Sequence, residues 1–177
     1  MGELTREKLE QVARGNTFIE TGFYHGSAVS KALEYGFTDI VSIELNPEFV
    51  AIGLQSFAAF PNVKIVHGDS PTVLLSICPN LTEQATFWLD GHYSGADTAL
   101  SSQYGVGPVL AELKAIATSP YKEHVIMIDD SRDFGSPGWP SKQDALDIIM
   151  SINPNYKIAY LDGYTDQHPN DIMVCYV

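Results

Sequence analysis

The sequence has few cysteines, no long apolar run and no segment typical of a secretory leader. Its two cysteines, Cys78 and Cys175, are too few for a disulfide framework and lack the spacing of metal ligands. No apolar run approaches the roughly 20 residues that a membrane-spanning helix needs. The first residues lack the basic and apolar regions of a signal peptide. We therefore expect a cytoplasmic protein that does not associate with membranes.

Positive charge is also scarce. The chain has 10 Lys and Arg residues against 22 Asp and Glu residues, which gives a formal net charge of −12. A field of this sign repels a phosphate backbone, and the sequence has no basic cluster that would offset it. We therefore expect no nucleic-acid partner. The charge favours a small molecule as substrate or, less readily, a protein.

The overall composition is that of an ordinary globular protein. The chain has 177 residues, of which 45% are hydrophobic and 18% charged. This length predicts a single domain, residues 1–177, with a sizeable core. Seven segments have the apolar pattern of strands, namely residues 17–20, 39–44, 62–67, 85–90, 124–129, 156–161 and 171–177. Helical patterns lie between most of them, at residues 4–14, 27–35, 47–60, 71–75, 108–118 and from Ser141 onward.

The alternation of strands and helices predicts an α/β fold. We expect a Rossmann-like three-layer sandwich with a seven-stranded, mostly parallel sheet. The last two strands have no helix between them, so they should pair antiparallel, with the last strand reversed in the sheet. In open sheets of this kind ligands bind at the carboxyl ends of the strands. Acidic residues stand at or just past five successive strand ends: Glu20, Glu44, Asp69, Asp90 and Asp129.

The turn in residues 18–29 is the first candidate ligand site. It contains Gly22 and Gly26, and the helix that opens at Ser27 offers free backbone N–H groups. The spacing Gly-x-x-x-Gly differs from the Gly-x-Gly-x-x-Gly pattern of dinucleotide binding. Glu20, just before the turn, would repel a pyrophosphate but attract an ammonium group. This turn therefore favours a nucleoside with a cationic amino-acid tail over a dinucleotide.

Two further acids follow the second and third strands. Glu44 lies 22 residues after Gly22, where an acid can accept hydrogen bonds from both hydroxyls of a ribose. The alternative is a surface glutamate. Asp69, in the sequence Gly-Asp-Ser, is placed to bind the amino group of a base, to cap the helix that starts near Pro71, or to do both.

Three segments resemble the cofactor motifs of class I S-adenosylmethionine-dependent methyltransferases. They are Glu-Thr-Gly-Phe-Tyr-His-Gly-Ser-Ala-Val at residues 20–29, Ile-Glu-Leu-Asn-Pro at 43–47 and Gly-Asp-Ser at 68–70. Within that superfamily the sequence most resembles metal-dependent O-methyltransferases of the catechol and macrolide-sugar type, over about residues 18–132. The resemblance implies that Glu20 and Gly22 contact the methionine portion, that Glu44 holds the ribose, and that Asp69 with Ser70 lies beside the adenine. The expected cofactor-binding residues are Glu20, Gly22, Tyr24, Gly26, Ser27, Glu44, Leu45, Asp69, Ser70 and Asp90.

A metal site is predicted where the fourth and fifth strands end. These strands should be neighbours, about 4.8 Å apart, so that Asp90, Asp129 and Asp130 converge. A divalent cation with oxygen ligands would relieve their repulsion, and Mg²⁺ fits because it keeps waters that a substrate can replace. The resemblance implies the same ligands. The alternative is that Asp129 or Asp130 caps the following turn.

Asp90 and His92 are the candidate catalytic residues. A metal lowers the pKa of a bound hydroxyl, and His92 is a suitable general base for its proton. The alternative is a loop histidine that bonds to backbone. Catechol-type enzymes carry a lysine just past this aspartate; its absence here favours a sugar or another hydroxylated metabolite. The predicted activity is methyl transfer from S-adenosylmethionine to such a hydroxyl.

Two long segments, residues 91–107 and 131–140, are expected to cover the acceptor site. Their aromatic residues either form its walls or anchor the loops: Tyr93, Tyr104, Phe134 and Trp139. Only about 17 residues precede the first strand, so the site is open, covered by these loops, or completed by a second subunit of a homodimer. Two other functions stay in consideration: a non-catalytic nucleoside-binding module and a nucleotide-dependent dehydrogenase.

Overall fold

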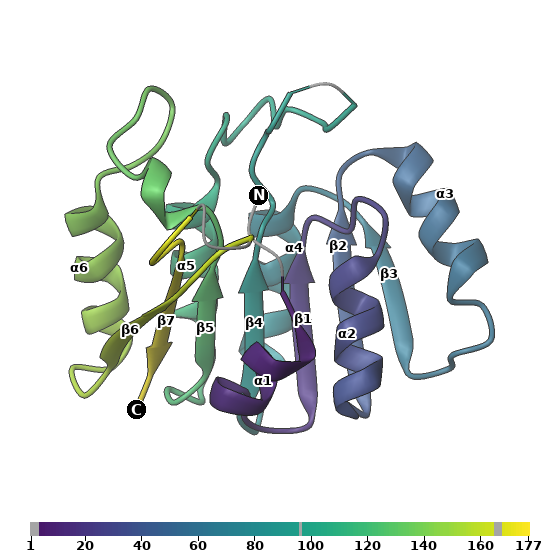
Figure 1. The fold of residues 1–177 in the computed structure, drawn as a ribbon, viewed down its shortest axis with the longest axis horizontal. Coiled ribbons are helices and arrows are strands. Elements are labelled where there is room, and N and C mark those ends of the chain that lie inside the picture. Colours follow the sequence, from purple (N-terminus) through teal and green to yellow (C-terminus); the bar gives the residue numbers. More distant parts are fainter. Residues whose placement is uncertain (1–3, 96, 165–167) are drawn as a thin grey trace.

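The centre of the fold is a seven-stranded sheet with the strand order β3-β2-β1-β4-β5-β7-β6 (Figure 1). It is seen in a computed structural model that describes residues 4–95, 97–164 and 168–177. Strands β1 to β5 pair in parallel, and β7 is antiparallel to both of its neighbours. The strands are β1 (Thr17–Thr21), β2 (Asp39–Glu44), β3 (Val63–His67), β4 (Ala85–Leu89), β5 (Val125–Ile128), β6 (Lys157–Leu161) and β7 (Ile172–Tyr176). The predicted fold class is thus confirmed.

Helices cover both faces of the sheet and make three layers. One hydrophobic cluster packs α1, α2 and α3 on one face, through residues such as Leu9, Val29 and Phe49. The other packs α4, α5 and α6 on the opposite face, through Leu74, Leu113, Ile149 and others. The helices are α1 (Arg6–Val12), α2 (Ser27–Tyr35), α3 (Pro47–Ser56), α4 (Ser70–Ile77), α5 (Val109–Ile116) and α6 (Lys142–Ile152). None of the helices in the described residues has the length and apolar character needed to cross a membrane.

Local signals fix where several helices begin and end. Gly36 adopts φ +107° and ends α2, as a glycine at this position does without strain. The Asn46 side chain accepts a hydrogen bond from the N–H of Glu48, and Pro47 occupies the first helical position of α3. Ser141 accepts from the N–H of Asp144 at the start of α6. Helix α3 ends at Ser56, earlier than the predicted residue 60.

The carboxyl ends of β1 to β5 all meet one edge of the sheet. The two long segments were predicted as loops, and their described residues, 91–95, 97–107 and 131–140, rise above this edge (Figure 1). A short 3-10 helix, Ser131–Asp133, begins the second of them. The fold therefore brings the five strand-end acids and both loops to the same side of the molecule.

Candidate active site

Two neighbouring cavities open at this edge of the sheet. The first, of about 490 Å³, lies over the ends of β2, β3 and β4 and reaches Arg132 and Trp139. The second, of about 420 Å³, lies on the side of α1 and α2 and contains Glu20. Gly22, Tyr24 and Asp90 line both, so the cavities meet at the glycine turn and the end of β4.

The two glycines of the turn are required by the packing of the chain itself. Gly22 has φ +85°, and a Cβ added there would lie 2.4 Å from the carbonyl oxygen of Asp90. Gly26 has φ +76°, and its Cβ would lie 2.7 Å from the Phe23 ring. Gly22 lines both cavities and Gly26 lines neither. The absence of side chains at these two glycines thus lets the turn pack closely against the protein's own backbone and core.

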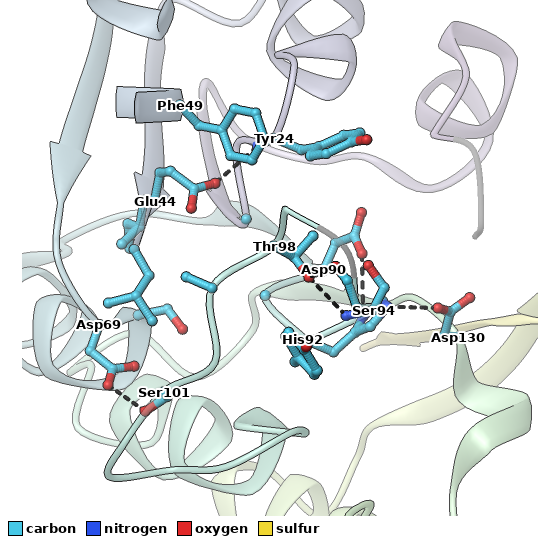
Figure 2. A pocket seen from close by; sticks show the side chains of 18 of the residues that line it. Tyr24, Glu44, Phe49, Asp69, Asp90, His92, Ser94, Thr98, Ser101 and Asp130 are labelled. Carbon is cyan, nitrogen blue, oxygen red and sulfur yellow. Dashed lines mark hydrogen bonds and ion pairs between the residues drawn. The ribbon is translucent and has the colours of Figure 1, made fainter. Parts of the chain in front are cut away.

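Glu44 holds the turn in place. Its side chain is buried at the end of β2, and Oε2 accepts a hydrogen bond of 2.9 Å from the N–H of Tyr24 (Figure 2). Oε1 accepts from the N–H of Asn46 at 2.7 Å. Tyr24 has φ +48°, an uncommon conformation for a residue with a side chain. Glu44 lines the first cavity, so the surface alternative is wrong, and each carboxylate oxygen keeps a lone pair for a further donor.

Asp69 stands at the N-cap position of α4, yet its side chain makes no capping hydrogen bond. Its Oδ2 instead accepts from Ser101 Oγ at 2.5 Å, and both residues line the first cavity (Figure 2). Ser101 Oγ also accepts from the N–H of Tyr104. Asp69 therefore holds Ser101, and with it the part of the loop of residues 91–107 around Ser101, at the cavity. A second tie of the same loop runs from Asn46 Nδ2 to the carbonyl oxygen of Asp97, at 2.9 Å.

Glu112 supports a site residue, Ser70, and the sequence did not predict this. It lies on α5, fully buried, and accepts a hydrogen bond of 2.5 Å from Ser70 Oγ. Burial raises the pKa of Glu112 to about 7. Ser70, an expected cofactor-binding residue, lines the first cavity while its hydroxyl faces this glutamate. The available signal was an acid among core positions of the predicted helix, next to Leu113.

Glu20 is buried at the end of β1 and accepts a hydrogen bond of 2.5 Å from Ser42 Oγ. Burial raises the pKa of Glu20 to about 8. It lines the second cavity, with Ser27, whereas Glu44, Leu45, Asp69 and Ser70 line the first. The expected cofactor-binding residues are thus divided between two connected spaces, with Gly22, Tyr24 and Asp90 at their junction.

His92 lies between two carboxylates. Its Nδ1 is 3.4 Å from Asp90 Oδ1, and its Nε2 is 2.8 Å from Asp130 Oδ2 (Figure 2). These contacts are made to side chains, whereas the alternative was a loop histidine bonded to backbone. The Trp139 ring packs beside His92, with the ring centroids 5.2 Å apart. Burial, together with the charges of Asp129, Asp130 and Glu20, raises the pKa of Asp90 well above its usual range.

Asp130 has donors on both of its carboxylate oxygens. His92 contacts Oδ2, and Nη1 of Arg132 contacts Oδ1 at 2.5 Å. Although burial opposes the change, these two neighbours lower the pKa of Asp130 well below its usual range. Asp130 precedes the short 3-10 helix with φ +50° and makes no side-chain capping bond there. For Asp130 the capping alternative is therefore wrong.

The acids that converge closely are not quite the predicted set. Among the described residues, the group with ligand oxygens within 4.8 Å of one another is Asp129, Asp130 and Asp171. Asp90 is not in this group, and Asp129 lines neither cavity. Arg132 Nη1 contacts Asp171 Oδ2 as well as Asp130. Sequence reasoning missed Arg132 and Asp171, whose only signals are a cation just after the aspartate pair and an acid that opens the last strand.

The aromatic residues of the two loops have different positions. Tyr93 and Trp139 line the first cavity. Phe134 packs against the hydrophobic core and meets the Trp139 ring edge at a centroid distance of 6.1 Å. Tyr104 lines neither cavity, and its N–H bonds to Ser101. Tyr93 and Trp139 are therefore walls, whereas Phe134 is an anchor.

No protein-family model matches the chain, and no curated protein matches it. Solved structures do. The S-adenosylhomocysteine-bound methyltransferase PaMTH1 from Podospora anserina is 13% identical, with 91% of this chain and 71% of that chain covered and a TM-score of 0.58. The O-methyltransferase TomG from Streptomyces achromogenes, in complex with S-adenosylmethionine, is 10% identical, with 92% and 73% covered and a TM-score of 0.59.

Spermidine synthase from Thermotoga maritima is also similar, at 14% identity and a TM-score of 0.59, with 96% of this chain and 58% of that chain covered. At these identities the likeness establishes a fold shared with these methyltransferases and with spermidine synthase, and it leaves the reaction open. The narrower resemblance to metal-dependent O-methyltransferases stays a prediction.

Proposed function

We propose that this protein is an enzyme that transfers a methyl group from S-adenosylmethionine to a hydroxyl of a small molecule, such as a sugar or another hydroxylated metabolite. The observation that carries the proposal is the first cavity. Glu44 and Asp69 stand on one side of it and the Asp90–His92 pair on another, within about 490 Å³. The nucleoside of the donor can thereby bind beside Glu44 and Asp69, while the methyl group reacts beside Asp90 and His92 in the same cavity.

The nucleoside fits the first cavity. Glu44 offers carboxylate lone pairs to the two ribose hydroxyls, because its existing bonds to Tyr24 and Asn46 use only one per oxygen. The apolar side chains of Leu45 and Phe49 line the same space and suit an adenine ring. Asp69 keeps Oδ1 for the exocyclic amino group while Oδ2 holds Ser101.

The amino-acid end of the donor fits the junction of the two cavities. Glu20 lies in the second cavity and supplies a carboxylate for an ammonium group. Gly22 lines both cavities, so its backbone lies beside the donor where the two cavities meet. This placement puts the sulfonium near Asp90, which lines both spaces.

The chemistry is a direct displacement. The acceptor oxygen attacks the methyl carbon, the carbon–sulfur bond breaks, and its electron pair stays on sulfur, which becomes a neutral thioether. The hydroxyl proton passes to the Asp90–His92 pair. The longer contact, 3.4 Å between Nδ1 and Asp90, is the open side of His92, whereas Nε2 is held by Asp130 at 2.8 Å. Alignment of the two reacting atoms supplies much of the rate enhancement.

A magnesium site formed by Asp90, Asp129 and Asp130 stays a prediction. The contacts of Asp130 do not favour a metal at that position. Both Asp130 oxygens already meet donors, from His92 and Arg132. A cation bound by Asp130 would have to displace one of them. We therefore assign no step of the reaction to a metal.

Calorimetric titration with S-adenosylhomocysteine and NAD, followed by a methyl-transfer assay against hydroxylated acceptors, tests the proposal. We expect heat with S-adenosylhomocysteine only, and turnover that is lost in His92→Ala. The absence of heat with S-adenosylhomocysteine would refute the proposal. Binding without turnover on any acceptor would favour the non-catalytic module, and heat with NAD the dehydrogenase.

A further inference from the structure

Three acids are buried together beside the candidate active site, and one of them, Asp130, lines the first cavity. Asp129, Asp130 and Asp171 are 1%, 4% and 0% exposed, and their ligand oxygens lie within 4.8 Å of one another. Three ionised carboxylates so close and so far from water repel one another strongly, and a positive charge among them relieves that repulsion. The Oδ1 atom of Asp171 is buried and makes no hydrogen bond to the described residues.

Arg132 supplies positive charge at this group. Its Nη1 contacts both Asp130 and Asp171, and Nη2 lies 3.8 Å from Asp133. The backbone holds the arginine there, because the N–H of Ser131 donates to the carbonyl oxygen of Asp171 at 2.7 Å. A planar guanidinium presents several fixed donors and suits two carboxylates at once better than an ammonium does.

The same contacts reach His92. Arg132 engages Oδ1 of Asp130 and His92 engages Oδ2, so the carboxylate lies between a guanidinium and an imidazole ring. We propose that the guanidinium of Arg132 takes the place of a divalent cation in this acidic group and, through Asp130, positions His92. Arg132 is thus a positioning residue, and the group needs no bound metal. Only the effect on methyl transfer rests on the function proposed above.

Metal binding tests this without any methyl donor or acceptor. After treatment with EDTA, the whole chain is titrated with Mn²⁺ and followed by calorimetry. We expect no Mn²⁺ site at the acidic group of the wild type and one in Arg132→Ala. Loss of a unit charge about 4 Å from the ion should raise affinity on the order of a hundredfold or more. Arg132→Lys, which keeps the charge, should resemble the wild type.

A double variant and a remote variant are the controls. Arg132→Ala with Asp171→Asn should lose the new site, because it removes one of the three ligands. Arg6→Ala changes an exposed arginine paired with Glu10 and should bind no Mn²⁺. Equal binding by the wild type and folded Arg132→Ala, or binding by neither, would overturn the proposal.

The wild type alone gives a second measurement, which holds even where Arg132→Ala fails to fold. In NMR spectra the ring protons of His92 should stay sharp in excess Mn²⁺, since Arg132 keeps the paramagnetic ion from Asp130. Selective broadening of these signals would overturn the proposal and favour the magnesium prediction.

The activity arm separates this inference from the proposed function. EDTA should leave methyl transfer by the wild type unchanged, and loss of activity that Mg²⁺ restores would overturn the inference. Arg132→Lys should retain more of kcat than Arg132→Ala. A chain with no methyl transfer at all would refute the proposed function, and the metal titration would still decide the role of Arg132.

Discussion

Glu44 shows how one carboxylate can shape a site and serve it. It is buried, and its two oxygens accept from the backbone N–H groups of Tyr24 and Asn46. The turn that faces the ligand therefore has its conformation set by the same side chain that we propose for the ribose. A substitution at Glu44 should act on binding both directly and through Tyr24, whose φ of +48° needs support.

Glu44→Gln should weaken S-adenosylhomocysteine binding about tenfold to a hundredfold, since hydrogen bonds to a charged group are worth about 1.5–3 kcal/mol. The amide also cannot accept on both sides, so one backbone N–H loses its partner. Calorimetric titration measures the change. Glu48→Gln, at an exposed position in the first turn of α3, is the matched control and should bind like the wild type. Equal loss in both variants would mean that Glu44 has no special role.

Glu20 gives the site a pH dependence. Its pKa is raised to about 8 by burial, so the neutral form prevails below that pH. An ammonium group binds the ionised form, and proton release must accompany binding at lower pH. The affinity for S-adenosylhomocysteine should therefore rise about tenfold per pH unit up to about pH 8 and then level off. Glu20→Gln should bind weakly with a flat profile. A steep profile in that variant would assign the titration to another group.

At the scale of elements, His124 connects the amino ends of β4 and β5. Its Nδ1 accepts from the N–H of Ala85 at 3.1 Å, and its Nε2 then donates to Ser119 Oγ at 2.9 Å. The ring is buried and the Tyr156 hydroxyl donates to the His124 carbonyl oxygen at 2.8 Å. Protonation of Nδ1 would remove the bond to Ala85, and burial lowers the pKa of His124 to about 4.

Folding stability should consequently fall in mild acid. The unfolded chain, with a histidine pKa near 6.5, binds a proton between pH 6.5 and 4 that the folded chain does not. The free energy of unfolding should drop by about 2 kcal/mol between pH 7 and pH 5 on account of this residue. Urea denaturation at both pH values measures it. His124→Asn should lose most of the drop, whereas His67→Asn, at an exposed position, should keep it.

The elements themselves were predictable from the sequence, whereas most side-chain directions were not. Buried strands such as β2 and β4 are apolar runs bounded by turn residues, which sequence patterns detect well. Asp69 was correctly placed at a helix start, where the pattern also suggested a cap. Only the folded chain brings Ser101, 32 residues later, to its side chain. The local sequence pattern around Asp69 does not reveal that Ser101 is its hydrogen-bond partner.

The same limit applies to the acidic group. A parallel sheet brings consecutive strand ends to one edge, so the placement of Asp90, Asp129 and Asp130 at that edge was predictable, whereas the acids that converge are Asp129, Asp130 and Asp171. Asp171 joins because β7 inserts antiparallel between β5 and β6, and its start therefore lies at the carboxyl end of β5. Arg132 pairs with it across 39 positions. The order of strands in the sheet, which the sequence leaves open, decides which acids meet.

At the scale of the whole molecule, ligand binding should stabilise the fold. The first cavity is bounded by the ends of β2, β3 and β4 and by both long loops, so a ligand there contacts segments from much of the chain. A ligand that binds only the folded state adds about 2.7 kcal/mol at a concentration 100 times its Kd. For a chain of this length that corresponds to a rise in Tm of about 5–10 °C. Scanning calorimetry with S-adenosylhomocysteine measures it. The rise should fall sharply in Glu44→Gln at the same concentration and persist in Glu48→Gln. An unchanged Tm for the wild type at saturating ligand would count against nucleoside binding in this cavity.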